Sequence, residues 1–268
     1  MPDMNSHDHG PSALRLVKQW SRKLLARAGY VCFSTRSREY YACDSLFTSN
    51  NDGFREKPFF KAAYGRGVEA SAGFDPQIEW RIHVALWAAR AASRLPGDFV
   101  ECGVNAGFTS SAIMHRLNWQ DTDKRFYLID TFNGPVLSQY SPDEVGRGRL
   151  QAAEDAMAKG AYVTSVDRVR ANYSEWPNVE IIQGVVPDVL PTLGIQQVAF
   201  LHLDMNCAYP ERAALEHFWD LLSPHAMVLF DDYAYFGNDC LAQAIDSAAG
   251  SLGTEVLSLP TGQGLIVK

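Results

Sequence analysis

Four of the apolar runs in this sequence end in an acidic residue. Carboxylates bind cations, accept hydrogen bonds from hydroxyl groups and, where their pKa allows, take up protons. In an open parallel sheet the carboxyl ends of the strands face one ligand crevice, so acids that end strands can act together. A single such Asp is also a common cap for the next helix, but a set of four favours a site. The four acids are Glu101, Asp130, Asp204 and Asp231.

A turn that contains two glycines follows the first of these acids. Residues 97–111 predict a buried strand at 99–101 and a helix that begins near Thr109. Between them lie Gly103 and Gly107, which let a ligand approach the backbone where a Cβ would collide. The free N–H groups at the start of the helix point to the same place. The stretch therefore predicts a turn that binds a nucleotide cofactor.

The residues around this turn distinguish between nucleotide cofactors. Folds that bind NAD carry Gly-x-Gly-x-x-Gly, whereas the spacing here is Gly103-x-x-x-Gly107. A carboxylate at Glu101 would repel a pyrophosphate, but it suits a cationic amino group. Asp130, which ends the next strand, suits ribose hydroxyl groups, as carboxylates do at this place in dinucleotide folds. A cofactor with a nucleoside at one end and a cationic amino acid at the other is S-adenosylmethionine.

The predicted cofactor site extends from this turn to the ends of the neighbouring strands. Its residues are Glu101, Gly103, Asn105, Gly107, Thr109, Ser110, Asp130, Thr131, Phe132, Gly184, Val185 and Asp204.

Strands and helices alternate after residue 97 as they do in a doubly wound sheet. An antiparallel final strand is the usual ending of class I methyltransferase sheets. We therefore predict an α/β fold: a doubly wound, Rossmann-like class I methyltransferase sheet with an antiparallel final strand, preceded by an N-terminal helical and irregular extension. The predicted strands are 99–101, 125–129, 179–183, 198–203 and 226–230, the helices are 77–94, 109–118, one within 133–160, 165–173, 187–193, 211–222 and 240–250, and the closing hairpin is 255–259 with 265–268.

The sequence divides into three parts. Residues 1–10 are polar and predict a disordered tail, residues 11–75 predict a helix and an aromatic-rich lid or interface arm, and residues 76–268 predict the methyltransferase domain. Residues 12–28 predict a basic amphipathic helix. We expect this helix to pack on a partner subunit or on the domain, which favours a homo-oligomer, a dimer or larger. The alternative is weak peripheral contact with an anionic membrane through the same residues.

The composition excludes several classes of protein. The net charge of −7 argues against a nucleic-acid partner, because surfaces that bind phosphate are basic. The five cysteines are scattered without Cys-x-x-Cys spacing, which fits a reducing compartment and gives no support to a zinc site. The sequence has no run of about 18 apolar residues and no apolar signal-peptide core near its start. We therefore expect a cytoplasmic protein without a transmembrane segment.

An ordered set of motifs in residues 75–268 resembles the macrocin O-methyltransferase family, which comprises metal-dependent sugar O-methyltransferases of macrolide and aminocoumarin pathways. The motifs are Glu79-Trp80-Arg81, the run Gly97 to Val104, the run Leu128 to Gly134, the run Gln183 to Pro191, Leu203-Asp204 with Ala214-Leu215-Glu216, and Phe230-Asp231-Asp232-Tyr233. The resemblance implies a methyl acceptor that is a hydroxyl group of a sugar, a glycosylated small molecule or a glycan.

The resemblance also implies a divalent metal, magnesium or another cation, held by Asp204, Asp231 and Asp232. Magnesium prefers oxygen ligands, and two vicinal hydroxyl groups of the acceptor would complete its coordination. Such a metal would acidify the attacking hydroxyl group and hold it in line with the methyl sulfonium.

This sequence departs from the family pattern at the predicted catalytic base. The family commonly carries Asp-x-Asp after the fourth strand, whereas Asn206 stands here at the second Asp, and Cys207 stands where some relatives carry a histidine. An amide does not take up a proton at neutral pH, although its carbonyl oxygen can bind substrate or metal. The predicted catalytic residues are therefore Asp204, Asn206 and His202. Tyr209, Tyr233 and water that accepts a proton from a metal-bound alkoxide are further alternatives for the base.

Two other functions are compatible with the same residues. A catechol-like diol would present the same vicinal oxygens to a metal, and the aromatic-rich residues 30–75 would suit a flat substrate if they lined the pocket. A methyltransferase-like domain that binds a ligand or partner without catalysis is the other alternative, motivated by Asn206 alone.

Overall fold

The computed structural model describes residues 13–30 and 40–268, so the predicted tail at 1–10 lies outside the described residues. Among these residues, 13–30, 40–42 and 47–50 belong to one compact unit, and 43–46 with 51–268 belong to a second. The second unit therefore begins earlier in the chain than the boundary at 75/76 expected from the sequence. No helix in the described ranges is long and apolar enough to cross a membrane.

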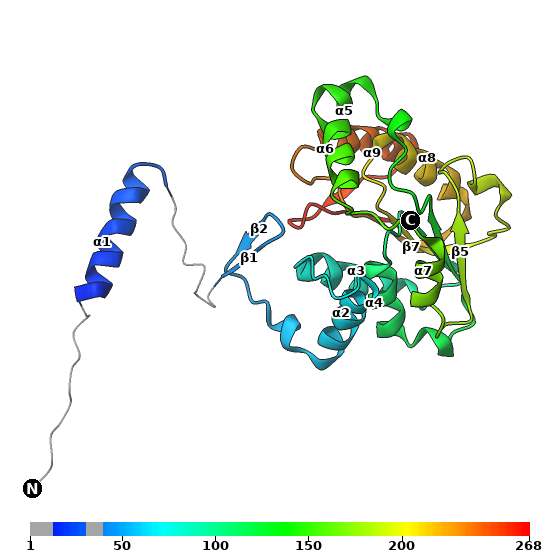
Figure 1. Ribbon diagram of the computed structural model, residues 1–268, viewed down its shortest axis with the longest axis horizontal. Helices are drawn as coiled ribbons and strands as arrows, with labels where there is room; N and C mark the ends of the chain where they lie inside the picture. Colours follow the sequence, from blue (N-terminus) through cyan, green and yellow to red (C-terminus); the bar gives the residue numbers. More distant parts are fainter. Residues whose placement is uncertain (1–12, 31–39) are drawn as a thin grey trace, which may run out of the picture. The chain divides into compact units, whose positions relative to one another are not determined.

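The order of elements after residue 97 is the predicted alternation of strands and helices (Figure 1). The strands are β1 (Tyr41–Cys43), β2 (Leu46–Thr48), β3 (Asp98–Cys102), β4 (Phe126–Asp130), β5 (Val179–Gln183), β6 (Val198–Leu203), β7 (Leu222–Phe230), β8 (Leu257–Ser258) and β9 (Gly264–Val267). The α-helices are α1 (Ala13–Arg27), α2 (Pro58–Ala70), α3 (Glu79–Ala92), α4 (Phe108–Leu117), α5 (Pro142–Gly146), α6 (Arg149–Ala158), α7 (Val166–Asn172), α8 (Ala208–Phe218) and α9 (Asp239–Ser251).

The main sheet has the strand order β5-β4-β3-β6-β7-β9-β8. The first five strands in this order are parallel, and β9 is antiparallel to β7 and to β8. The strand order reverses beside β3, which is where doubly wound sheets bind their ligands. This arrangement confirms the predicted fold class, including its antiparallel final strand.

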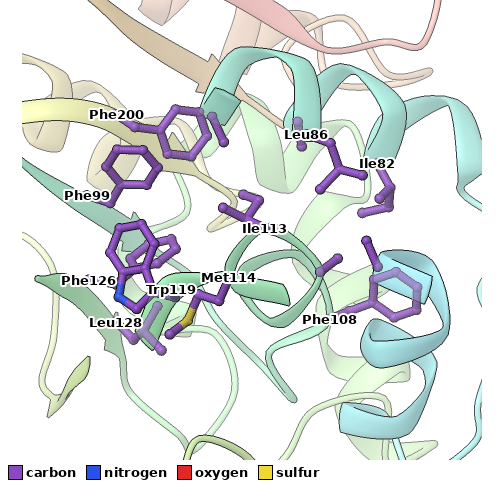
Figure 2. Close-up of a cluster of buried hydrophobic side chains, with 14 of the residues drawn as sticks. Ile82, Leu86, Phe99, Phe108, Ile113, Met114, Trp119, Phe126, Leu128 and Phe200 are labelled. Carbon is purple, nitrogen blue, oxygen red and sulfur yellow. The ribbon is translucent and has the colours of Figure 1, made fainter. Parts of the chain in front are cut away.

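Both faces of the sheet are covered, which explains why its central strands are mostly apolar. Phe99 of β3, Phe126 of β4 and Phe200 of β6 lie in one core cluster with residues of α3 and α4 (Figure 2). Phe99 packs against Phe200, and both Phe99 and Phe126 pack against Trp119. Alternate residues of the same strands, such as Val100, point to the other face and pack against α8 and α9. Figure 1 shows α2, α3 and α4 on one side of the sheet and α8 and α9 on the other.

Helix α2 lies in the aromatic-rich stretch, where the sequence gave no clear periodicity. Pro58 occupies its first turn, a position at which the missing N–H costs nothing. Phe60 and Tyr64 are buried in the core cluster that also contains Phe108 of α4. Gly67 permits the close approach of α2 to α4, because a Cβ there would lie 2.7 Å from the Phe108 ring. This part of the stretch therefore belongs to the core of the second unit.

Some predicted boundaries differ from the structure for local reasons. Helix α8 begins at Ala208, three residues before the predicted start at Glu211. The buried carboxylate of Glu144 accepts a hydrogen bond from the backbone N–H group of Ala208, and that of Glu211 accepts one from Met205, just before the helix. Strand β7 begins at Leu222, because its first residues already pair with β6. The helix predicted at 187–193 is a short 3₁₀ turn at Leu190–Thr192.

Candidate active site

The carboxyl ends of four parallel strands surround one pocket. Gly103 follows β3, Asp130 ends β4, Gly184 follows β5 and Asp204 follows β6, and all four line this pocket. Its volume is about 120 Å³. The remaining lining residues are Asn105, Ile129, Thr131, Gly134, Pro135, Val136, Gln139, Tyr162, Val163, Val186, Met205, Asn206, Cys207 and Pro210.

The glycine turn adopts the backbone conformation that its sequence predicts. Gly103 has a φ of +88°, and a Cβ there would overlap the carbonyl oxygen of Asp204. Gly107, with a φ of +89°, precedes the first residue of α4, and a Cβ there would overlap the hydroxyl group of Tyr173. Both positions therefore require glycine, the first because β3 and β6 approach closely at the pocket.

Asp130 supports the glycine turn as well as lining the pocket. One oxygen of its carboxylate accepts hydrogen bonds from the backbone N–H groups of Val104, at 2.7 Å, and Asn105, at 2.9 Å. The other oxygen accepts from the backbone N–H group of Phe132, at 2.7 Å. A carboxylate has further acceptor sites, so these bonds leave room for a ligand hydroxyl group. They also show that the carboxylate of Asp130 stabilises the turn, in addition to its predicted contact with ribose.

Asn105 holds the segment 161–163, which is remote in the sequence and contributes to the pocket wall. Its side-chain amide donates to the carbonyl oxygen of Ala161 at 3.0 Å, and its side-chain oxygen accepts from the backbone N–H group of Val163 at 2.8 Å. These two bonds flank Tyr162, which lines the pocket. The side chain of Asn105 therefore binds this segment. Asn105 also lines the pocket, where a cofactor can contact it.

The other residues predicted to bind the cofactor lie at or behind the pocket. Thr131 and Gly184 line it, and a Cβ at Gly184 would lie 2.7 Å from the Cβ of Val189. Ser110 is fully buried, with its hydroxyl group 2.7 Å from that of Tyr173. Six of the predicted residues are absent from the described lining, namely Glu101, Gly107, Thr109, Ser110, Phe132 and Val185.

A buried polar chain runs below the pocket from β3 to β7. His202 is fully buried on β6 and lies in register with Glu101, and its Nδ1 is 2.8 Å from a Glu101 carboxylate oxygen. Its Nε2 is 3.9 Å from a carboxylate oxygen of Asp231, which is an ion-pair distance and too long for a hydrogen bond. Burial alone would lower the pKa of His202, but these carboxylates raise it to about 10. Neither Glu101 nor His202 is among the described lining residues.

Arg81 joins the two acids that follow β7. Its Nη1 donates to a carboxylate oxygen of Asp231 at 2.7 Å and to one of Asp232 at 2.8 Å. Its Nε donates at 2.6 Å to Asp44, in the turn between β1 and β2. Burial opposes ionisation of Asp231, but the charge of Arg81 outweighs it and lowers the pKa of this carboxyl group. Arg81 itself is only 6% exposed, so it forms the buried cationic centre of this cluster.

Asp204 and Asn206 lie together at the end of β6. The side-chain amide of Asn206 is 3.2 Å from a carboxylate oxygen of Asp204. Glu211 accepts hydrogen bonds at 3.0 Å from the backbone N–H groups of Met205 and Asn206, and Asn206 has a φ of +55°. Glu211 therefore fixes the turn that presents both site residues to the pocket. Asn206 occupies the place of a base but serves here as a hydrogen-bond donor.

The three acids implied as metal ligands fit a divalent cation in charge and donor type. Burial and then the charges of Asp231 and Asp232 raise the pKa of Asp204, and burial with Asp231 does the same for Asp232. This repulsion would be relieved by a cation, and carboxylate oxygens are ligands that magnesium prefers. In the ranges 13–30 and 40–268, however, no three acidic, His or Cys side chains are already arranged as metal ligands. Arg81 accounts for part of this, because it holds two of the three acids.

Two residues of the site were not predicted from the sequence. Arg81 was recognised only as part of a motif, although its position four residues before Ala85 places a cation on the apolar stripe of α3. Tyr162 lies in a connection without periodicity, and no sequence signal indicates that this connection returns to the glycine turn.

A model of the macrocin-O-methyltransferase family matches residues 83–248, more than half of the chain. A curated relative from Streptomyces olivaceus, 8-demethyl-8-(2,3-dimethoxy-alpha-L-rhamnosyl)-tetracenomycin-C 4'-O-methyltransferase, is 28% identical over 167 residues. This match covers 60% of the chain and 61% of the relative, so the chain spans less than two thirds of that protein's length.

Solved structures with low sequence identity share the fold. The O-methyltransferase NovP is 18% identical with a TM-score of 0.62, and the match covers 81% of this chain and 99% of NovP. The calicheamicin methyltransferase CalS11 is 14% identical with a TM-score of 0.54, over 87% of this chain and 99% of CalS11.

Proposed function

The chain belongs to the macrocin-O-methyltransferase family, and from this premise we propose that it is an O-methyltransferase that transfers the methyl group of S-adenosylmethionine to a hydroxyl group of a sugar. The acceptor is a free sugar unit, a glycosylated small molecule or a glycan. One observation carries this proposal: the ends of four parallel strands deliver two glycines and two acids to the same pocket.

The pocket suits the two ends of the cofactor differently. Asp130 offers its remaining acceptor sites to ribose hydroxyl groups, and Gly184 lines the pocket at the neighbouring strand end. Glu101 lies beneath the glycine turn, and one of its carboxylate oxygens is buried without a hydrogen-bond partner. This free acceptor oxygen favours the cationic amino end of the cofactor near Gly103. The methyl group would then face Asp204.

A divalent cation, magnesium in the first instance, is part of the proposal. Asp204, Asp231 and Asp232 would hold it. When bound, it would lower the pKa of the acceptor hydroxyl group and neutralise the charge that develops on its oxygen. The chain's own contribution is to hold these acids: Arg81 binds one oxygen each of Asp231 and Asp232, and Asn206 binds one oxygen of Asp204.

The proton of the acceptor hydroxyl group passes most simply to Asp204. Asp204 lines the pocket at the end of β6, so its carboxylate can reach a hydroxyl group bound there. His202 is fully buried below the strand ends, so its role is to hold Asp231 in place. Asn206 would position the acceptor or Asp204 through its amide.

The sugar acceptor rests on the relative whose name describes a rhamnosyl 4'-O-methyltransferase. A catechol-like acceptor would gain support if the aromatic-rich stretch lined the pocket. None of the described residues 51–75 does so. We therefore keep the sugar as the first candidate and the catechol as the comparison in the test. A cytoplasmic location and self-association through α1 are parts of the same proposal.

The test is methyl transfer from S-adenosylmethionine that carries a labelled methyl group, followed by mass spectrometry of the acceptor. The acceptors are α-L-rhamnosides of aromatic aglycones and catechols of similar size, each with and without magnesium and with EDTA. We expect labelled rhamnoside, no labelled catechol, and loss of transfer with EDTA. Transfer to the catechols alone would contradict the sugar acceptor, and undiminished transfer with EDTA would contradict the metal.

A further inference from the structure

The segment 161–163 contributes Tyr162 and Val163 to the pocket wall and is bound there by the cofactor turn. Asn105 belongs to the turn between Gly103 and Gly107, and its backbone N–H group is bound by Asp130. Its side chain makes two hydrogen bonds to this segment, one to Ala161 and one to Val163. One amide thus satisfies both a carbonyl oxygen and an N–H group on either side of a single residue. We call residues 161–163 the strap.

That single residue is Tyr162. It is partly buried, and it lines the pocket with Asp130 and Asp204. No described residue makes a hydrogen bond to its hydroxyl group in this structure. The hydroxyl group is also not fully enclosed by protein atoms. Because that group lacks a partner and is not enclosed, a ligand oxygen can take the place of water beside it.

The strap also brings Tyr162 into the field of the site's acids. Burial, followed by the charge of Asp204, raises the pKa of Tyr162, and Asp232 and Asp130 act in the same direction. The phenol therefore stays neutral at physiological pH. A neutral phenol is a hydrogen-bond donor, and the oxygen of an acceptor hydroxyl group approaching Asp204 is a suitable partner.

We propose that Tyr162 binds the methyl acceptor by donating a hydrogen bond to one of its hydroxyl or ring oxygens, and that Asn105 positions Tyr162 by holding the strap. This inference rests on the proposed function for the identity of the ligand, whereas the contacts of Asn105 can be tested without it. It extends the role of the glycine turn, since the same turn that receives the cofactor also places the residue that receives the acceptor.

Hydrogen exchange of the full chain without ligands tests the positioning role of Asn105. Asn105→Gly removes both side-chain bonds and keeps the left-handed backbone conformation (φ of +50°) accessible. We expect the amide of Val163 to exchange about tenfold faster in this variant, as the loss of a hydrogen bond predicts. Asn118→Gly is the matched control, because Asn118 also has a positive φ (+49°), is exposed and lies outside the pocket. Equal exchange at 161–163 in wild type and Asn105→Gly would overturn the positioning role.

Calorimetry in the presence of S-adenosylhomocysteine tests the role of Tyr162. The probe is methyl α-L-rhamnoside, and Tyr162→Phe removes only the hydroxyl group. We expect Kd for the rhamnoside to rise about tenfold and Kd for S-adenosylhomocysteine to stay within twofold of wild type. Tyr30→Phe, at an exposed tyrosine, is the control and should change neither value. In turnover, Tyr162→Phe should raise KM for the acceptor more than it lowers kcat.

The outcomes separate this inference from the proposed function. An unchanged Kd for the rhamnoside in Tyr162→Phe would overturn the role of Tyr162 while the function stands. A wild-type protein that binds S-adenosylhomocysteine but no rhamnoside would overturn both the acceptor class and the role of Tyr162. The exchange of the strap in Asn105→Gly would still decide the positioning role, because it needs no ligand.

Discussion

Arg81 carries more of the site than any residue predicted from the sequence. Arg81 is 6% exposed, and its guanidinium group bonds three carboxylates, those of Asp44, Asp231 and Asp232. It also lies over the ring of Tyr235, with 4.7 Å between its Cζ and the ring centroid. A planar group with several fixed donors can serve these partners at once, which an ammonium group cannot. Arg81 therefore determines how the acids that follow β7 are oriented.

We predict that Arg81→Met destabilises the protein by about 3–5 kcal/mol, because it leaves buried carboxylates without a counter-ion. Arg81→Lys should cost less, because it keeps the charge and loses only the fork of donors. The measurement is the free energy of unfolding in urea. As a control, Arg212→Met breaks a pair with Glu216 in which both side chains are about half exposed, and should cost less than about 1 kcal/mol. A loss for Arg81→Met as small as that of the control would contradict this account of the cluster.

At the level of single residues, the sequence predicted types and positions better than partners. Asp130, Asp204 and Asp231 lie at the strand ends where the pattern put them. Their hydrogen bonds were not predictable, because they come from residues remote in the sequence. Arg81 precedes Asp231 by 150 residues, and no local spacing encodes such a contact. The roles assigned to these residues in binding cofactor and metal stay predictions.

At the level of elements, the turn after β3 has the most demanding geometry. Gly103 combines a left-handed backbone with close contact to the carbonyl group that follows β6. This contact sets the spacing of two strand ends that line the pocket. A side chain there would push them apart, and the pocket would change with them.

We predict that Gly103→Ala costs more stability than Gly148→Ala and weakens binding of S-adenosylmethionine. Gly148 also has a positive φ, of +77°, but a Cβ there would meet no atom within 4 Å. Its replacement should therefore cost only the conformational penalty of about 1–2 kcal/mol. Urea unfolding gives the stability of both variants, and calorimetry gives the cofactor affinity. Equal costs, with cofactor binding intact in both variants, would show that the close contact has no such role.

The parallel strands were predictable because each is a short apolar run bounded by polar or glycine residues. Helix α2 and the strap escaped prediction for the opposite reason. In α2 the buried residues are mixed with exposed aromatic ones such as Phe59, so its sequence lacks a clean stripe. The strap has no regular backbone pattern at 161–163, and its position comes from side-chain bonds to Asn105.

For the whole molecule, α1 provides the main candidate for a contact beyond this chain. Val17, Trp20 and Leu24 of α1 are each more than 60% exposed, and they recur at spacings of three and four residues. Exposed apolar stripes of this kind are commonly covered by another surface. The expected homo-oligomer would provide that surface.

We predict that the wild-type chain has the mass of a dimer or larger oligomer by light scattering, and that replacing Trp20 and Leu24 together by Glu yields a monomer. The control is Lys23→Ala, which removes a charge and leaves the apolar stripe intact. The same mass for wild type and the double variant would contradict self-association through α1. Cosedimentation of a monomeric wild type with phosphatidylserine vesicles would favour the membrane alternative instead.

The central claim is that the cofactor lies between the glycine turn and the β5 end, with its sulfur directed at the acids that follow β6 and β7. A crystal structure with S-adenosylhomocysteine and magnesium tests this most directly. We predict electron density for the nucleoside beside Asp130 and Gly184, with the sulfur facing Asp204 and the metal bound by Asp204, Asp231 and Asp232. A nucleoside bound elsewhere, or a sulfur that faces away from these acids, would contradict the account.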